Sequence, residues 1–232
     1  MLVLAIDASS AAVTVGVARV QPAAPVRVIA QRTVIDARAH AELLSSFARA
    51  CVAEAGADMG DLQAVVGGIG PGPYTGLRVG IVTAAAFADA LGIAVYGVCS
   101  LDAIGLAAAA PGPVLVAADA RRKEVYWARY VDGARLGDPQ VHRPAALREL
   151  IDSGAAAATA MTGAGARLYA DELGLPLLDV DHPPVGGLVA LAAERIAAAA
   201  PSEILVPLYL RQPDAEVPTA PAKSTLGPAE PR

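Results

Sequence analysis

The sequence predicts a two-lobed α/β fold in which mixed sheets are flanked by helices. Short apolar runs rich in valine, each about as long as a buried strand, alternate with longer segments whose apolar residues recur at helical spacing. Hydrophobic residues make up 55% of the chain and charged residues only 18%, which favours buried sheets with covered faces over disorder. A length of 232 residues is enough for one large domain or two small lobes.

The first lobe is predicted over residues 1–99 and begins with an antiparallel meander. Leu2 to Ile6 make a compact apolar strand. Valines alternate with smaller residues over 13–17, as in a second strand, and a third strand is expected over 26–34.

The next segment, 40–55, is predicted to be a helix with two different faces. Leu44, Phe47 and Cys51 make a face of larger apolar residues. Small side chains beside it would let another helix approach closely; they are Ala41, Ser45, Ala48, Val52 and Ala55. This stripe is covered either by a second helix of the same chain or by another chain.

A strand, a glycine-rich turn and a second helix follow over 64–91. Ala64 to Ile69 has the length and the valine content of a buried strand, and apolar residues recur at helical spacing from Leu77 to Leu91. Thr75 is expected to cap this helix. The turn before it suits either an anion at the helix N-terminus or a tight structural connection. We favour the structural connection, because no Gly-Lys-Ser/Thr ending follows.

A second lobe is predicted over 100–211, and its last helix is expected either to stay in this lobe or to pack back on the first. Its predicted helices are 101–110, 144–152 and 185–200, and its predicted strands are 114–118, 125–131 and 156–162. Proline, alanine and scattered charges dominate 212–232, so this tail is expected to be disordered.

Composition and charge argue against several classes of protein. No uninterrupted apolar run reaches the ~20 residues needed to span a bilayer, and Met1 to Asp7 lacks the basic region of a signal peptide. Cys51 and Cys99 have no metal-ligand spacing, so we expect buried thiols and a cytoplasmic protein. The net charge is −5, and the longest basic run is closed at once by Glu124. Stable tRNA binding by this chain alone is therefore not expected.

Three motifs carry a family resemblance. Gly70-Pro-Gly-Pro-Tyr-Thr-Gly-Leu-Arg-Val-Gly80 resembles the Gly-Pro-Gly-Ser-Phe-Thr-Gly-Leu-Arg signature of the TsaB (YeaZ) family, with Pro73 and Tyr74 in place of Ser-Phe. Residues 119–126 resemble its Asp-Ala-Arg-Arg-x-Glu-Val-Tyr pattern, and residues 207–211 resemble its Pro-x-Tyr-Leu-Arg ending. The resemblance is spread over nearly the whole folded chain.

The resemblance implies an actin/hexokinase-like (ASKHA) fold and a non-catalytic subunit. Such a subunit binds TsaD and, with it, the small ATPase TsaE, in the synthesis of N6-threonylcarbamoyladenosine next to the tRNA anticodon. No cofactor of its own is expected, since ATP and metal belong to the partner subunits, and tRNA is reached only through the complex. The alternative is an enzyme of the same fold that acts by itself, either a small-molecule kinase or a peptidase-like hydrolase.

The helices predicted over 40–55 and 75–91 are expected to form the contact with TsaD, because TsaD shares this lobe. An isologous homodimer through the same patch would compete with that contact. The predicted contact residues are Ala41, Ser45, Ala48, Val52, Gly76, Gly80, Ala84 and Phe87.

A residual ligand cleft is predicted between the lobes. In actin-like folds the first hairpin carries an aspartate and hydroxyl groups near phosphate, and Asp7 and Ser9 occupy that place here. The alternative, which we prefer, is that they only satisfy N–H groups of their own turn. The charges of 119–124 likewise suit either the cleft or a solvated hairpin. The candidate cleft residues are Asp7, Ser9, Gly70, Gly72, Thr75, Asp119 and Arg121.

No metal site is expected. TsaD, the catalytic relative, carries two metal-binding histidines four residues apart at the start of the first helix, a spacing that puts both on one face. Here the residue four after His40 is Leu44, and the remaining histidines, His142 and His182, lie far along the chain.

Overall fold

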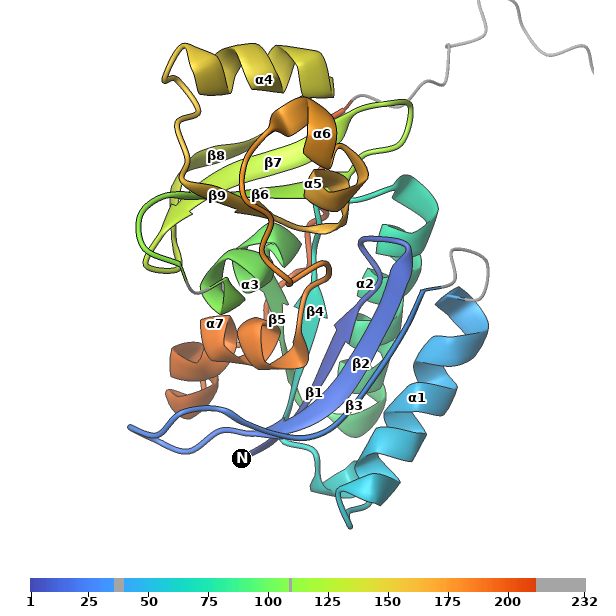
Figure 1. The fold of residues 1–232 in the computed structure, drawn as a ribbon. Coiled ribbons are helices and arrows are strands. Elements are labelled where there is room, and N and C mark those ends of the chain that lie inside the picture. The colour runs from blue at the N-terminus through green and yellow to red at the C-terminus, as the bar shows by residue number, and fades with distance from the viewer. Residues whose placement is uncertain (36–39, 109, 212–232) are drawn as a thin grey trace, which may run out of the picture.

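The fold consists of two mixed β-sheets, each covered by helices on both faces (Figure 1). The computed structural model describes residues 1–35, 40–108 and 110–211. The predicted α/β architecture with mixed sheets flanked by helices is confirmed. The tail over 212–232, expected to be disordered, lies outside the described residues, and that expectation stays a prediction.

The first sheet has five strands in the order β3-β2-β1-β4-β5. Strands β1 (Leu2–Asp7), β2 (Ala12–Arg19) and β3 (Arg27–Ile35) form the predicted antiparallel meander. Strands β4 (Ala64–Gly68) and β5 (Ala94–Val98) continue the sheet parallel to β1. All six residues of the central β1 are buried, because both faces of the sheet are covered.

Helices α1 (His40–Glu54) and α2 (Tyr74–Leu91) cover one face of this sheet, and a short 3-10 turn, Met59–Asp61, leads from α1 to β4. Helix α7 (Val185–Ala197) covers the other face. The large residues of α1 and the alternating valines of the strands thus meet in one core cluster, as their periodicity indicates.

The second sheet has four strands in the order β8-β7-β6-β9. Strands β6 (Val114–Asp119) and β7 (Val125–Val131) form a hairpin, β8 (Ala134–His142) extends it antiparallel, and β9 (Ala160–Thr162) pairs parallel to β6. Helix α3 (Ser100–Ala107) packs its buried residues against this sheet and also contributes Ala103 to the cluster under α7. It therefore lies between the two sheets.

Three helices cover the outer face of the second sheet (Figure 1). They are α4 (Pro144–Asp152), α5 (Ala164–Leu168) and α6 (Ala170–Leu173). Their buried residues surround Leu115 and Trp127, so the second lobe has its own hydrophobic core.

Strand β8 is absent from the elements that the sequence predicts. It lies at the edge of its sheet and is mostly exposed, so it lacks the apolar alternation of a covered strand. Its Gly137 and Pro139 also discourage a strand prediction, although an edge position tolerates both. The strand expected over 156–162 is shorter than predicted and begins at Ala160.

After α7 the chain crosses both lobes in an extended segment, residues 201–211, here named the C-terminal strap. The backbone N–H of Glu203 donates to the carbonyl of Val95 on the edge strand β5, and the N–H of Leu208 donates to the carbonyl of Ile69. The strap thereby covers an edge that would otherwise expose unpaired backbone groups. Helix α7 and the first half of the strap lie on the first sheet, although both fall within the 100–211 range predicted for the second lobe. No helix in the described ranges combines the length and the apolar character needed to cross a bilayer.

Candidate partner-binding surface and a closed cleft

The carboxylate of Asp7 is buried and accepts hydrogen bonds from its own chain on both oxygens. Oδ1 accepts from the backbone N–H of Ser9 at 3.0 Å and from the Ser9 hydroxyl at 2.8 Å. Oδ2 accepts from the hydroxyl of Ser100 at 2.5 Å. The Ser100 hydroxyl in turn accepts from the N–H of Gly70 at 3.1 Å. Three segments of the chain, at residues 7–9, at Gly70 and at Ser100, are therefore joined around this carboxylate.

The glycine turn before α2 is filled by the same network. A Cβ built on Gly68 would lie 1.8 Å from Oδ2 of Asp7, and one built on Gly72 would lie 2.0 Å from the carbonyl oxygen of Ser9. Both distances are far below van der Waals contact, so these positions need glycine to let the turn pack on the β1–β2 connection. This geometry supports the structural connection over an anion site.

Burial shifts the pKa of two titratable groups near this turn. It raises the pKa of the Asp7 carboxyl, while the hydrogen bonds from Ser100 and Ser9 act against that shift. It lowers the pKa of the His182 imidazole, which Asp181 and Asp7 partly offset. Nδ1 of His182 lies 3.2 Å from the hydroxyl of Ser10, so a residue of the second lobe reaches the first hairpin.

Gly70 and Gly72 belong to the turn that packs around Asp7, whereas Thr75, Asp119 and Arg121 share no hydrogen bond with Asp7 within the described part of the chain. Asp119, at the end of β6, accepts from the N–H of Arg121 at 2.8 Å and pairs with its guanidinium at 3.5 Å. Thr75 is exposed and lies within α2, whose N-cap is Pro73 without a side-chain cap. The prediction that Thr75 caps this helix is therefore wrong, because the N-cap is Pro73, two residues earlier.

Among the described residues, no group of three or more histidine, cysteine, aspartate or glutamate side chains is placed to hold a metal ion. Nδ1 of His142 accepts a hydrogen bond from the indole N–H of Trp127 at 2.9 Å. Cys51 and Cys99 are buried free thiols, and burial raises the pKa of Cys99 to about 12, which favours the neutral thiol at this position.

Much of the predicted partner stripe is covered by the chain itself. Ala48 and Ala84 are both 0% exposed, and Val52 is buried in the same cluster between the helices and the first sheet. Gly80 packs against Ala8, with a built Cβ at 3.1 Å. The prediction that these four residues contact another chain is therefore corrected, since a partner could reach them only by displacing this chain's own core.

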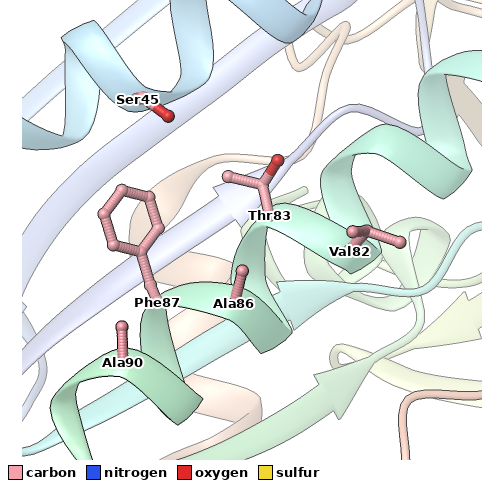
Figure 2. A pocket seen from close by; sticks show the side chains of 6 residues that line it. All are labelled: Ser45, Val82, Thr83, Ala86, Phe87 and Ala90. Carbon is pink, nitrogen blue, oxygen red and sulfur yellow. The ribbon is translucent and has the colours of Figure 1, made fainter.

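The other members of the predicted stripe lie at or near the surface. Ser45 is exposed, Phe87 and Gly76 are partly exposed, and the side chain of Ala41 lies outside what the structure describes. Figure 2 shows Ser45 on α1 facing Phe87 and Thr83 on α2. These positions on the outer side of the helix pair therefore remain predicted contact residues.

The exposed side of α2 carries two grooves that sequence periodicity did not identify. The first, about 300 Å³, runs between α1 and α2 (Figure 2) and is lined by Ser45, Val82, Thr83, Ala86, Phe87 and Ala90. The second, about 480 Å³, runs between α2 and the C-terminal strap and is lined by Ile81, Val82, Ala85, Ala86, Asp89, Glu203, Ile204 and Leu205. They share Val82 and Ala86, and the linings of both together are named the α2 face.

Large apolar side chains on and beside this face are exposed to solvent. Val82 is 65% exposed, Ile204 is 90% exposed, and the neighbouring Val206 is 64% exposed. Isolated exposed apolar residues are ordinary, but a contiguous group around two grooves is typical of a docking surface. The strap holds this group in place, because Glu203 pairs with Arg195 at 2.6 Å and accepts from the N–H of Gly97 at 2.9 Å.

Comparison with known proteins shows which family the chain belongs to. The family model described as TsaD, tRNA N6-adenosine threonylcarbamoyltransferase, matches residues 33–215. The chain belongs to the TsaD family.

Within this family the chain is TsaB/YeaZ-like. The structure of YeaZ from Pseudomonas aeruginosa superposes with a TM-score of 0.70 at 26% identity, over 90% of this chain and 99% of YeaZ. The protein TsaB of Escherichia coli, named for tRNA threonylcarbamoyladenosine biosynthesis, is 33% identical over 96 residues, which are 40% of this chain and 42% of TsaB. The likeness to YeaZ over nearly its whole length agrees with the predicted α/β fold of mixed sheets flanked by helices.

An uncharacterised protein of Mycobacterium leprae is 46% identical over 99% of this chain. The chain spans only 61% of the length of that relative.

Proposed function

We propose that the chain is a non-catalytic subunit in the synthesis of N6-threonylcarbamoyladenosine in tRNA, and that it docks a TsaD-like subunit through the α2 face. The observation that carries the proposal is the exposed apolar group around Val82 and Ile204. Membership in the TsaD family and likeness to YeaZ support a role in the synthesis of N6-threonylcarbamoyladenosine. The role would place the chain in the cytoplasm.

The chemistry of the α2 face supports a protein occupant. Its grooves are lined mainly by alanine, valine, isoleucine, leucine and phenylalanine, and the second groove also includes Asp89 and Glu203. The alanines of α2 let a partner helix approach its backbone closely, while Val82 and Ile204 supply apolar area to bury. Because TsaD is expected to share this lobe, a pseudo-symmetric pairing of helix faces is the simplest mode of contact.

The interior of the first lobe supports a subunit without chemistry of its own. Leu44, which stands where TsaD carries its second metal-binding histidine, is fully buried in the core. Asp7, the best candidate for contact with a phosphate, is engaged on both oxygens by Ser9 and Ser100. We therefore propose that ATP and metal bind on the partner subunits, a TsaD-like protein and a TsaE-like ATPase, and that tRNA joins through the complex.

A homodimer through the α2 face belongs to the same proposal. An isologous pair would bury Val82 of one chain against the other and would be displaced by the TsaD-like subunit. Its population should fall as the TsaD-like protein is added, a change that analytical ultracentrifugation measures directly.

The test is capture of the TsaD-like protein of the same organism by the full-length chain. The variants Val82→Arg and Ile204→Arg each place a charge in the proposed contact and should weaken capture by about a hundredfold, since an unpaired buried charge costs several kcal/mol. The matched control is Leu168→Arg, because Leu168 is also exposed, at 59%, but lies on α5 of the second lobe.

All three variants should melt within a few degrees of the wild type, because the substituted side chains are exposed. Failure of the wild type to capture the TsaD-like protein would contradict the proposal. Equal capture by Val82→Arg, Ile204→Arg and Leu168→Arg would show that the contact lies elsewhere.

One observation favours a rival function, hydrolysis by the chain itself. The Ser10 hydroxyl and Nδ1 of His182 lie at the distance of a nucleophile and its base. Against it, both oxygens of the neighbouring Asp181 accept from Nε of Arg167, so that this carboxylate is occupied. Hydrolysis of a p-nitrophenyl ester, or ATP turnover, lost in His182→Gln would establish the rival; we expect neither activity.

A further inference from the structure

The outer edge of β5 is satisfied mostly by side chains rather than by a neighbouring strand. The backbone groups of Val95 and Gly97 bond outside the sheet, and the carbonyl of Val95 accepts from the N–H of Glu203 at 2.9 Å. The N–H of Val95 donates to the hydroxyl of Ser202 at 3.1 Å. The N–H of Gly97 donates to Oε2 of Glu203 at 2.9 Å, and the carbonyl of Gly97 accepts from Nη1 and Nη2 of Arg195, each at 3.2 Å. Three of these four backbone groups therefore depend on side chains.

Arg195 holds the strap to this edge from the opposite side of the sheet. It lies on α7, and α7 and α2 cover opposite faces of the first sheet (Figure 1). Its Cζ lies 5.6 Å from the centroid of the Tyr96 ring, and its Nη1 pairs with Oε1 of Glu203 at 2.6 Å. Burial acts to raise the pKa of Glu203, but the N–H of Gly97 and the Arg195 guanidinium outweigh it and lower that pKa. The charged pair of Arg195 and Glu203 is named the strap clamp.

Two residues after Glu203, the strap inserts a leucine into a notch between two glycines. Gly67 of β4 and Gly97 of β5 pair in register. A Cβ built on Gly67 would lie 3.0 Å from Cδ1 of Leu205, and one built on Gly97 would lie 3.2 Å from Cδ2 of Leu205. Leu205 packs against the core cluster under α1 and α2. Because side chains alternate along an extended segment, Ile204 and Val206 face solvent.

The second groove of the α2 face depends on this segment. Glu203, Ile204 and Leu205 line the groove on the side of the strap and are named the strap wall. Arg195 itself lies outside the linings of both grooves. The N–H groups of Glu203 and Leu208, five residues apart, donate to backbone carbonyls of the first lobe. Between those two bonds, the strap clamp and the seat of Leu205 hold the wall against α2.

We propose that the strap clamp sets the affinity of the α2 face for the TsaD-like subunit by holding the strap wall in place before the partner binds. The inference rests on the function proposed above and makes Arg195 a positioning residue for that surface. A segment already held in its bound conformation loses less freedom on association, so a residue outside the contact can raise affinity. By linkage, the bound partner also stabilises the strap on β5.

The first measurement is the dissociation constant between the full-length chain and the TsaD-like protein of the same organism. Arg195→Ala leaves the lining of both grooves unchanged and should weaken binding by about tenfold, because the strap wall must then be ordered on association. Arg195→Lys keeps a donor for Glu203 and should bind more tightly than Arg195→Ala, although it lacks the planar guanidinium that also reaches Gly97.

The matched control is Arg135→Ala. The side chain of Arg135 is 29% exposed, against 34% for Arg195, and it pairs with Asp102 from β8 of the second sheet. This variant removes a comparable ion pair away from the strap, so it should bind the TsaD-like protein within about twofold of the wild type. Thermal melts of all variants show that they are folded.

Amide hydrogen exchange, followed by NMR on the isolated chain, tests the mechanism without the partner. In Arg195→Ala the N–H of Glu203 should exchange at least about tenfold faster than in the wild type, and the N–H of Leu208 should change little. A double-mutant cycle tests the route of the effect. Arg195→Ala combined with Glu203→Ala should bind within about twofold of Glu203→Ala alone, because Arg195 acts through Glu203.

Four outcomes overturn the inference. Unchanged binding by Arg195→Ala, while Ile204→Arg loses capture, removes the clamp and leaves the proposed function standing. Unchanged exchange at Glu203, or a double variant whose loss is the product of the two single losses, shows that Arg195 does not act through the strap. An equal loss in Arg135→Ala makes the effect one of general stability. Failure of the wild type to bind the TsaD-like protein overturns the proposed function and this inference with it.

Discussion

The turn around Asp7 and the α2 face differ in whether their side chains already have partners within the chain. The carboxylate of Asp7 is buried and has hydrogen-bond donors from Ser9 and Ser100 on both oxygens. Val82 and Ile204 on the α2 face have most of their apolar area in water. A ligand at Asp7 would have to break existing hydrogen bonds, whereas a partner on the α2 face would remove apolar surface from water.

This difference shows why ligand-like residue types are a poor guide to the site in this chain. Asp7, Ser9 and the glycines of the turn have the chemistry of a phosphate site, yet the first lobe uses them to join its hairpin to α2 and α3. The small residues of α2 have no reactive chemistry, yet their outer members line two grooves. Three pairs of substitutions test this difference.

The largest effect is expected from two substitutions on opposite sides of α2. Ala84→Arg puts a charge into the core beneath the helix and should destabilise the fold by roughly 3–5 kcal/mol, enough to lower the melting temperature by about 10 °C or more. Ala86→Arg, two residues along and exposed in both grooves, should leave the melt nearly unchanged. Thermal unfolding followed by circular dichroism measures both. Similar melting temperatures for the two variants would mean that Ala84 is not a core residue.

A smaller effect is expected in the glycine turn. Gly72→Ala drives a methyl group against the backbone carbonyl of Ser9, which cannot rotate away as a side chain could. The cost should be about 3 kcal/mol. The control is Gly60→Ala, since a Cβ there meets nothing within 4 Å, and urea unfolding of both gives the difference. An unchanged free energy of unfolding for Gly72→Ala would show that the turn is loose enough to admit another group.

The smallest effect is expected at Asp7. Asp7→Ala leaves the hydroxyls of Ser9 and Ser100 without their acceptor and should cost about 1–3 kcal/mol. Asp7→Asn keeps an acceptor and removes the buried charge, so at pH 7 it should melt at or above the wild type.

The pH dependence of the stability difference between the wild type and Asp7→Asn shows in which direction the pKa of Asp7 is shifted in the folded state. Burial raises the pKa in the folded state above the ordinary aspartate value of 3.8, so between the two values the folded chain binds more protons than the unfolded chain. The wild type therefore loses stability as pH rises through that window. The advantage of Asp7→Asn should shrink on acidification, as measured by melts between pH 4 and pH 8. An advantage that grows on acidification would mean that the serine hydrogen bonds outweigh burial.

The sequence by itself determined most of the secondary structure and the family. The helix predicted over 144–152 has those bounds in the structure, where it is α4. The strands β1, β2 and β4 lie within about two residues of their predicted ends. Periodicity and valine content succeed here because covered faces impose them on the sequence. The glycine-rich motif from Gly70 to Gly80 indicated the TsaB/YeaZ likeness that the comparisons show.

Local signals failed where no covered face or cap imposes a pattern. Strand β8 is an exposed edge strand that contains a proline, so its sequence resembles that of a loop. Thr75 has the chemistry of an N-cap but stands inside α2, because the backbone of Pro73 starts the helix. In both places the neighbouring elements, rather than the local residue types, decide the conformation.

Only the tertiary structure decided which predicted residues are available to another molecule. It joins Asp7 to Ser100 and Ser10 to His182, pairs separated by 93 and 172 residues, and it brings Arg211 to the β6–β7 turn. It also covers Ala48 and Ala84 while leaving Val82 exposed. A helical period reports which residues share a face, but the packing of one element on another decides whether that face meets the chain's own sheet or water.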